Sequence, residues 1–215
     1  AVGKDVTKGN VGDIKVTDCQ NKIAIPGIID GRVFVGEPGF EYKENYTTLS
    51  QAAISGGVTS VVTMPNTDPV VDNVSTFDFI KRRARDKSLI KIHSLASLTK
   101  NTEGHEICEF GLLKLSGAIG FTDGVKSIQN NNVMDKIFNY AKNQNALVIQ
   151  FPQDNELSKN GVINEGLIAT KLGLKGIPDY AEHLVIERIL DFLININQSI
   201  TLHYLSLIHI SEPTR

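Results

Sequence analysis

The chain has 215 residues, of which 41% are hydrophobic and 21% are charged, a composition typical of a soluble globular protein with a sizeable core. A formal net charge of -2 gives no electrostatic case for a nucleic acid or an anionic membrane as partner. No apolar run approaches the roughly 20 residues that a membrane helix needs. The two cysteines, Cys19 and Cys108, fall in no metal-binding or redox spacing, so we expect a cytoplasmic protein.

Short apolar segments rich in β-branched residues alternate along the chain with segments of helical periodicity, which predicts a parallel α/β arrangement. The predicted strands cover residues 28–35, 58–64, 90–95, 118–121, 146–151 and 199–205. The predicted helices cover residues 46–55, 74–86, 105–115, 132–143 and 181–195. Six strands separated by five helical segments predict most of a TIM (β/α)8 barrel, whose usual length is about 250 residues. We therefore expect an incomplete barrel.

The end of the first predicted strand carries two side chains in a spacing typical of metal sites. Residues at i and i+2 of a strand share a face, so Arg32 and Phe34 point the same way. Two histidines at this spacing can chelate one ion, but a guanidinium has no lone pair to donate and a phenyl ring has no ligand atom. Neither Arg32 nor Phe34 can therefore ligate a metal ion.

Residues 26–39 resemble the dihydroorotase branch of the cyclic amidohydrolases, in which the same frame reads P-G-x-I-D-x-H-x-H-x-R-E-P-G. Arg32 and Phe34 stand where that family has two zinc-binding histidines, and Gly36 stands where it has an arginine that binds the substrate carboxylate. The resemblance implies a barrel of the metal-dependent hydrolase type, expected over residues 26–205. It also implies a small β-sandwich, of which residues 1–25, including 22–25 as a short strand, are expected to be a remnant.

Two further motifs carry the resemblance along the chain. Residues 52–67 are similar to A-A-x-G-G-x-T-x-x-x-x-M-P-N-T, whose asparagine, here Asn66, helps to bind the substrate carboxylate in the family. Residues 117–124 resemble G-A-x-x-F-[ST]-D-D-G, in which an aspartate can bridge two metals; Asp123 matches the first aspartate and Gly124 replaces the second. An isolated carboxylate before a glycine more often forms an Asx-turn or a helix cap, and we expect that role for Asp123.

The remaining ligand positions of the family are also substituted. Phe151 and Gln153 replace the histidine and the glutamate of V-x-Q-H-x-E-D, and Tyr204 replaces a histidine of x-H-x-x-H-x-S, with Thr201 at the companion position. A slip of one residue would bring His203 to the ligand position, but such a slip turns the side chain to the opposite face of the strand. We therefore expect His203 to be a packing residue.

Two segments lie outside these motifs. A basic cluster falls on the second predicted helix between Asp78 and Asp86, which favours a solvated helix face over an anion site. Its members are Lys81, Arg82, Arg83, Arg85 and Lys87.

The chain begins at Ala1 instead of methionine, and residues 206–215 resemble translated adapter sequence, so we expect a fragment with a non-native tail.

The leading hypothesis is a dihydroorotase-like protein without hydrolase activity and without a cofactor. The resemblance implies an oligomeric structural subunit for aspartate transcarbamoylase in pyrimidine biosynthesis. The alternative is an active zinc-dependent cyclic amidohydrolase, such as a dihydroorotase that hydrolyses dihydroorotate to N-carbamoyl-aspartate, with Asp123 as its catalytic candidate. A third possibility is a pocket that binds a carboxylate metabolite through Asn66 without turnover.

Overall fold

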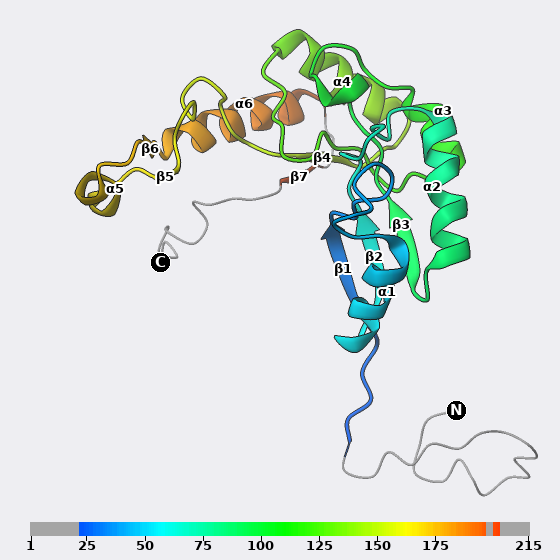
Figure 1. Cartoon of the computed structure of the whole chain (residues 1–215). Helices are drawn as coiled ribbons and strands as arrows, with labels where there is room; N and C mark the ends of the chain where they lie inside the picture. Colours follow the sequence, from blue (N-terminus) through cyan, green and yellow to red (C-terminus); the bar gives the residue numbers. More distant parts are fainter. Residues whose placement is uncertain (1–21, 197–199, 203–215) are drawn as a thin grey trace, which may run out of the picture.

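The computed structural model describes residues 22–196 and 200–202. Its centre is an arc of parallel strands, shown in Figure 1. These strands are β1 (Ile28–Val33), β2 (Val58–Thr63), β3 (Lys91–Ser94), β4 (Val148–Gln150) and β7 (Ile200–Leu202). β1, β2 and β3 form one sheet in that order, and β4 pairs with β7. Phe121 connects the two sheets through parallel bridges to Ala96 and Val148. Six strand positions therefore follow one another in chain order, which is the parallel barrel arrangement predicted from the sequence.

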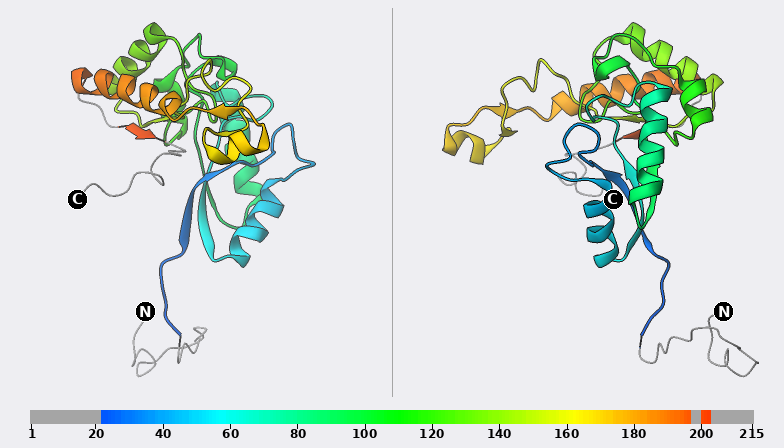
Figure 2. Two further views of the ribbon diagram at one scale, coloured as in Figure 1. Left: turned by 90° about the vertical axis from the view of Figure 1, so that its left-hand side faces the viewer. Right: turned by 45° about the vertical axis from the view of Figure 1, so that its right-hand side comes forward.

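Five helices lie at the predicted places, and all but α3 agree with the predicted ranges to within one residue at each end. They are α1 (Tyr46–Ser55), α2 (Val74–Lys87), α3 (Phe110–Ser116), α4 (Asn131–Asn143) and α6 (Tyr180–Ile196). Asparagine side chains begin three of them: Asn45, Asn73 and Asn130 each accept backbone N–H bonds from the first helical turn. Figure 2 shows α4 and α6 beside each other at one end of the arc and α1 at the other.

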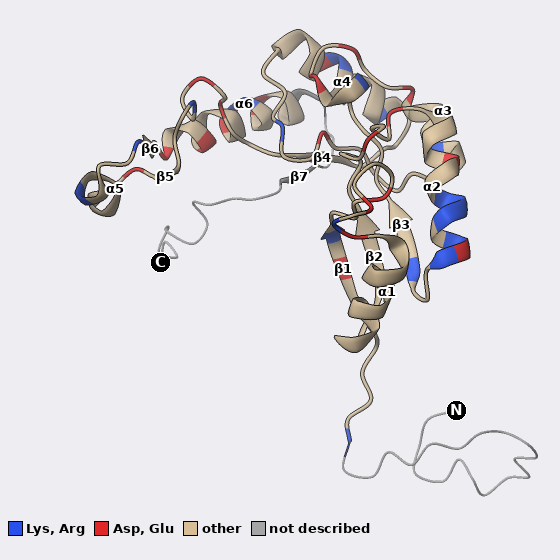
Figure 3. Cartoon of the chain, in the orientation of Figure 1, with Lys and Arg blue, Asp and Glu red and all other residues tan. Residues whose placement is uncertain are grey.

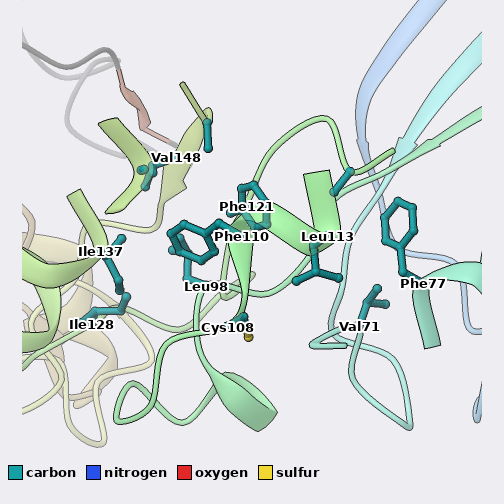
Figure 4. Packing of buried hydrophobic residues seen from close by; sticks show 14 of the residues in the cluster. Val71, Phe77, Leu98, Cys108, Phe110, Leu113, Phe121, Ile128, Ile137 and Val148 are labelled. Atoms are coloured by element: carbon teal, nitrogen blue, oxygen red, sulfur yellow. The ribbon is translucent and has the colours of Figure 1, made fainter. Parts of the chain in front are cut away.

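The main core lies between the helices and one face of the arc (Figure 4). Phe110 of α3 is its central ring, with its centroid 4.4 Å from that of Phe121 and 5.0 Å from that of the stacked Tyr140 ring of α4. A second, smaller cluster of Met64, Leu95 and Ile149 packs apart from the main core. Buried side chains therefore form two separate packing clusters around the arc, and Val35 and Met64, which lie just after β1 and β2, belong to one each.

Three elements differ from those predicted. Helix α3 begins at Phe110 instead of residue 105, because residues 106–108 pair with residues 98–100 through the Thr99–Ile107 antiparallel bridge. The strand expected over residues 118–121 is reduced to the bridges at Phe121. An excursion that was not predicted lies between β4 and α6. It consists of β5 (Ile163–Asn164), α5 (Leu167–Leu172) and β6 (Gly176–Ile177).

Residues 22–27 form no strand, although a strand was expected over residues 22–25. Ile23 and Ile25 are 90% and 71% exposed, because no described residue packs over them. Residues 1–21 and 206–215, on which the expectations of a β-sandwich remnant and a tail rest, lie outside the described residues. Within the described part of the chain, no helix combines the length and the apolar character needed to cross a membrane.

Candidate functional site

The carboxyl end of β1 carries the first two ligand positions. Val33 and Val35 face the core beneath the helices, and Val35 is only 1% exposed. Because side chains alternate along a strand, Arg32 and Phe34 belong to the opposite, inner face of the arc. Burial lowers the pKa of the Arg32 guanidinium from its ordinary value. The inner face thus presents a guanidinium and a phenyl ring where a metal would need lone pairs.

Phe34 packs against the loop that follows it. Its ring centroid lies 6.3 Å from that of Phe40, and Phe40 lies 6.5 Å from Tyr42. The Lys43 ammonium nitrogen is 5.0 Å from the Phe40 ring centroid, within reach of a cation–π interaction. The aromatic side chain at this ligand position therefore stabilises the loop.

That loop closes over Gly36, the position of the family's substrate-binding arginine. The Gly36 carbonyl accepts a hydrogen bond from the Phe40 N–H, 2.5 Å away. A Cβ atom added to Gly36 would overlap the Phe40 carbonyl oxygen and lie 2.9 Å from the Glu44 carbonyl oxygen. Any side chain at residue 36 would require the backbone to move.

We therefore expect the Gly36→Ala substitution to cost about 1–3 kcal/mol of stability, the range for forcing extra atoms into a packed site. Urea unfolding of the complete protein would measure it. Gly31→Ala is the matched control, since a Cβ at Gly31 has no neighbour within 4 Å. Equal stability of both variants would show that the loop yields readily.

Glu37 follows Gly36 and is buried, with 2% of its side chain exposed. Its Oε1 accepts a hydrogen bond from Arg83 Nε of α2 at 2.6 Å, and its Oε2 accepts one from the Tyr46 N–H at the start of α1 at 3.1 Å. Glu37 corresponds to the glutamate of the R-E-P-G frame, so this retained residue connects the loop to two helices.

Asp123 is also buried and structural, 3% exposed. Its Oδ1 accepts hydrogen bonds from Ser97 Oγ (2.7 Å) and from the N–H groups of Leu98 and Thr99 (both 2.9 Å). Its Oδ2 accepts one from Thr99 Oγ1 at 2.5 Å. Burial raises the pKa of Asp123, and the donated hydrogen bonds oppose that rise in part. The expected Asx-turn or helix cap is thus corrected: the carboxylate holds the loop after β3.

Asn66 lies beside the Asp123 loop. A Cβ at Gly124 would be 3.5 Å from Asn66 Cγ, and glycine is required there because its φ is +72°. The Asn66 Oδ1 atom is buried and has no hydrogen-bond partner among the described residues. The structure therefore brings together Asn66 and Gly124, two of the positions selected from the sequence.

The other predicted positions are more dispersed. Phe151 comes directly after β4 and is half-buried. Gln153 is half-buried, and its backbone carbonyl accepts a hydrogen bond from Gln129 Nε2 at 3.0 Å. Thr201 pairs in register with Ile149 in the β4–β7 sheet. His203 and Tyr204 lie outside the described residues.

Zinc, which the resemblance implies, requires about four nitrogen, sulfur or oxygen ligands. The described ligand positions offer Arg32, Phe34, Phe151 and a carboxylate at Asp123 whose two oxygens already accept four hydrogen bonds. Among the described residues there is no group of three or more His, Cys, Asp or Glu side chains that could hold a metal. These residues do not fit a zinc ion.

The sequence does not predict the pairing of Glu37 with Arg83. Arg83 belongs to the basic cluster for which the sequence favours a solvated helix face. Arg83 reaches inward to Glu37 across 46 residues of sequence. One sequence signal pointed to a structural role for Glu37: it is retained in the R-E-P-G frame although it is not one of the metal-ligand positions. Cys108 agrees with the expectation of an idle thiol, because it is buried and burial raises its pKa to about 12.

Comparisons with known proteins agree with these motifs. The family model described as "Dihydro-orotase-like" matches residues 21–212. A dihydroorotase of Ehrlichia chaffeensis is 39% identical over 198 residues, which are 92% of this chain and 43% of that protein. One of Endomicrobium trichonymphae is 40% identical over 197 residues, 92% of this chain and 46% of that protein. The chain thus spans less than half the length of these curated relatives.

Solved structures show the same architecture. An L-hydantoinase of Arthrobacter aurescens matches with a TM-score of 0.63 at 16% identity, over 82% of this chain and 41% of that one. A dihydroorotase of Saccharomyces cerevisiae in complex with 5-fluoroorotic acid matches with a TM-score of 0.55 at 16% identity, over 82% and 47% of the two chains. At this identity the likeness shows only the fold, which here is part of a TIM barrel. The family model and the curated relatives show more: this chain belongs to the dihydroorotase-like family.

Proposed function

We propose that this chain is part of a dihydroorotase-like protein of pyrimidine biosynthesis that does not hydrolyse dihydroorotate. In this proposal it serves as a cytoplasmic structural subunit for aspartate transcarbamoylase. The observation that carries the proposal is the closed loop at Gly36, because the family's substrate-binding arginine cannot be accommodated there without backbone movement. The name of its relatives supports the pathway, and the substituted ligand positions support the loss of activity.

The chemistry of the hydrolysis makes these substitutions severe. Zinc lowers the pKa of a bound water from 15.7 to about 7, and without it the attacking hydroxide is scarce at neutral pH. Asp123 offers no replacement as a general base, because both of its oxygens are occupied by donors from residues 97–99. The retained residues of the frame, Glu37 and Asp123, instead hold loops in place.

A second candidate is an active zinc-dependent dihydroorotase, favoured by 39–42% identity to proteins of that name. That candidate requires a metal site built largely from residues outside the described part of the chain. The two candidates differ in metal content and in turnover.

The deciding experiment uses the complete protein purified without chelator. We expect a zinc content far below one ion per chain, no dihydroorotate hydrolysis above the uncatalysed rate, and co-elution with aspartate transcarbamoylase in size-exclusion chromatography. One or two zinc ions per chain together with turnover would overturn the proposal in favour of the enzyme. Absence of both turnover and co-elution would overturn the scaffold role alone.

A further inference from the structure

A groove lies along α2 on the helix side of the arc, away from the residues of the candidate site. It has a volume of about 740 Å³ and lies between the second half of α2, the start of β3 and Gly117. Helix α3, which follows β3 in the chain, has only seven residues. The groove lies where the second half of α2 faces the start of β3.

The rim of this groove is strongly cationic, whereas the chain as a whole carries a formal charge of -2. Four basic residues line it, against one acidic residue, Asp78. The basic residues are Lys81, Arg82, Arg85 and Lys91. Of the four, Arg85 pairs with Asp86 at 2.8 Å, and the Lys81 ammonium donates a hydrogen bond to the Ser116 carbonyl at 2.9 Å. Figure 3 shows this concentration on the lower part of α2 and at the start of β3. Lys81, Arg82 and Arg85 belong to the basic cluster for which the sequence favours a solvated helix face, and the structure places these three together with Lys91 around a concave surface.

The inner wall of the groove is mainly apolar. Phe77 and Ala84 of α2 are buried beneath it, and Ile90 and Ile92 are half-buried beside them. Nearby, the Ile119 N–H donates to the carbonyl of Ser94, a lining residue, and Ile119 is 44% exposed. A ligand for this surface must therefore combine negative charge with aliphatic side chains.

The shape of the groove narrows the class of ligand. The wall from Phe77 to Ser88 extends about 17 Å along a helix axis, the length of roughly three helical turns. The neighbouring strand β3 is paired with β2 on one side and bonded through Ser94 and Ala96 to residues 119 and 120 on the other. The end of β3 at Ser94 is therefore already paired on both sides, and the helix-length wall favours helix-in-groove binding as the recognition mode.

We propose that this groove binds an acidic amphipathic helix of a partner protein, with its carboxylates on the basic rim and its aliphatic side chains on the apolar wall. The cations lie on long, exposed side chains, which suits charge-complementary docking of a macromolecule and not the enclosed recognition of a small anion. The groove lies away from the ligand positions, so the inference goes beyond the proposed function and stands whether or not the barrel hydrolyses dihydroorotate.

The test uses the complete protein and a labelled synthetic peptide of about 18 residues, with leucine along one helix face and glutamate on both flanks. Arg82→Glu combined with Lys91→Glu reverses the charge on both walls of the groove. Lys136→Glu combined with Lys142→Glu makes the same charge change on exposed positions of α4. We expect the groove variant to weaken binding by at least about tenfold and the α4 variant by less than about twofold.

Three results would overturn the proposal. The first is an equal loss of peptide affinity in both variants, and the second is undiminished binding of a peptide that has serine in place of leucine. The third is stronger displacement of the peptide by inorganic phosphate than by sodium chloride of equal ionic strength. The first two would indicate non-specific charge attraction, and the third a small-anion site. Thermal unfolding of both variants checks that each remains folded. Peptide binding should also slow amide hydrogen exchange in residues 77–94. This measurement locates the binding surface, which an affinity measurement alone cannot do.

Discussion

Substituting Arg83 by leucine is expected to cost the complete protein about 3–5 kcal/mol of stability, because it leaves a buried carboxylate without its counter-charge. Glu37 is only 2% exposed, whereas Arg83 is 43% exposed, and their closest atoms are 2.5 Å apart. Urea unfolding at neutral pH would measure the loss. Arg82→Leu, one residue earlier and on the exposed side of α2, is the control and should change stability by no more than about 0.5 kcal/mol.

The pair also predicts a rescue. Adding Glu37→Gln to Arg83→Leu removes the unpaired charge while keeping an oxygen that can accept the Tyr46 N–H bond. The double variant should therefore be more stable than Arg83→Leu alone. A double variant as unstable as the single one would indicate that the alkyl part of Arg83 supplies the stability through packing.

Asp123→Ala is expected to have an effect of similar size, about 3–5 kcal/mol, since it removes the acceptor of four hydrogen bonds in a buried loop. Asp123→Asn keeps the size of the side chain and one acceptor oxygen, so it should cost less, about 1–2 kcal/mol. Urea unfolding of the two variants checks the order. An alanine variant as stable as the wild type would contradict the structural role.

The same residue gives a pH dependence with a defined sign. Burial raises the folded-state pKa of Asp123 above its ordinary value of 3.8. The stability that this carboxyl contributes is therefore complete below that value and decreases as the pH rises through the folded-state pKa. The stability difference between the wild type and Asp123→Asn, which does not titrate, should accordingly shrink as the pH is raised from 4.

These expectations change how an activity test at Asp123 must be interpreted. Loss of turnover in Asp123→Ala would follow from a collapsed loop as readily as from a lost catalytic group. Only Asp123→Asn, with its unfolding free energy measured beside its rate, separates the two causes.

The barrel order and most of the helix boundaries could be predicted from the sequence, because they depend on local signals. Helix α1 was predicted with both ends correct, since Asn45 caps its start and Gly56 follows its end. The late start of α3 could not be predicted, because it results from the non-local pairing of residues 98–100 with residues 106–108. The excursion containing α5 was also missed, as its strands have two residues each.

Within the candidate site, the ligand substitutions were evident from residue types, but the tasks of the retained residues were not. Asp123 and Glu37 are held in place by hydrogen bonds to residues that lie 24 and 46 positions away in the sequence. No rule based on residue spacing in a single sequence reveals such bonds. The groove could not be predicted for a related reason: the basic positions of α2 are visible in the sequence, but their arrangement with Lys91 around one groove becomes apparent only in three dimensions.

The closed loop at Gly36 has a consequence for substitutions at this position. An arginine introduced at this position would overlap the Phe40 carbonyl oxygen, so this single substitution is expected to destabilise the protein. Accommodating it would first require the backbone around Phe40 and Glu44 to move. The closed loop therefore couples the side chain that residue 36 can carry to the backbone around Phe40 and Glu44.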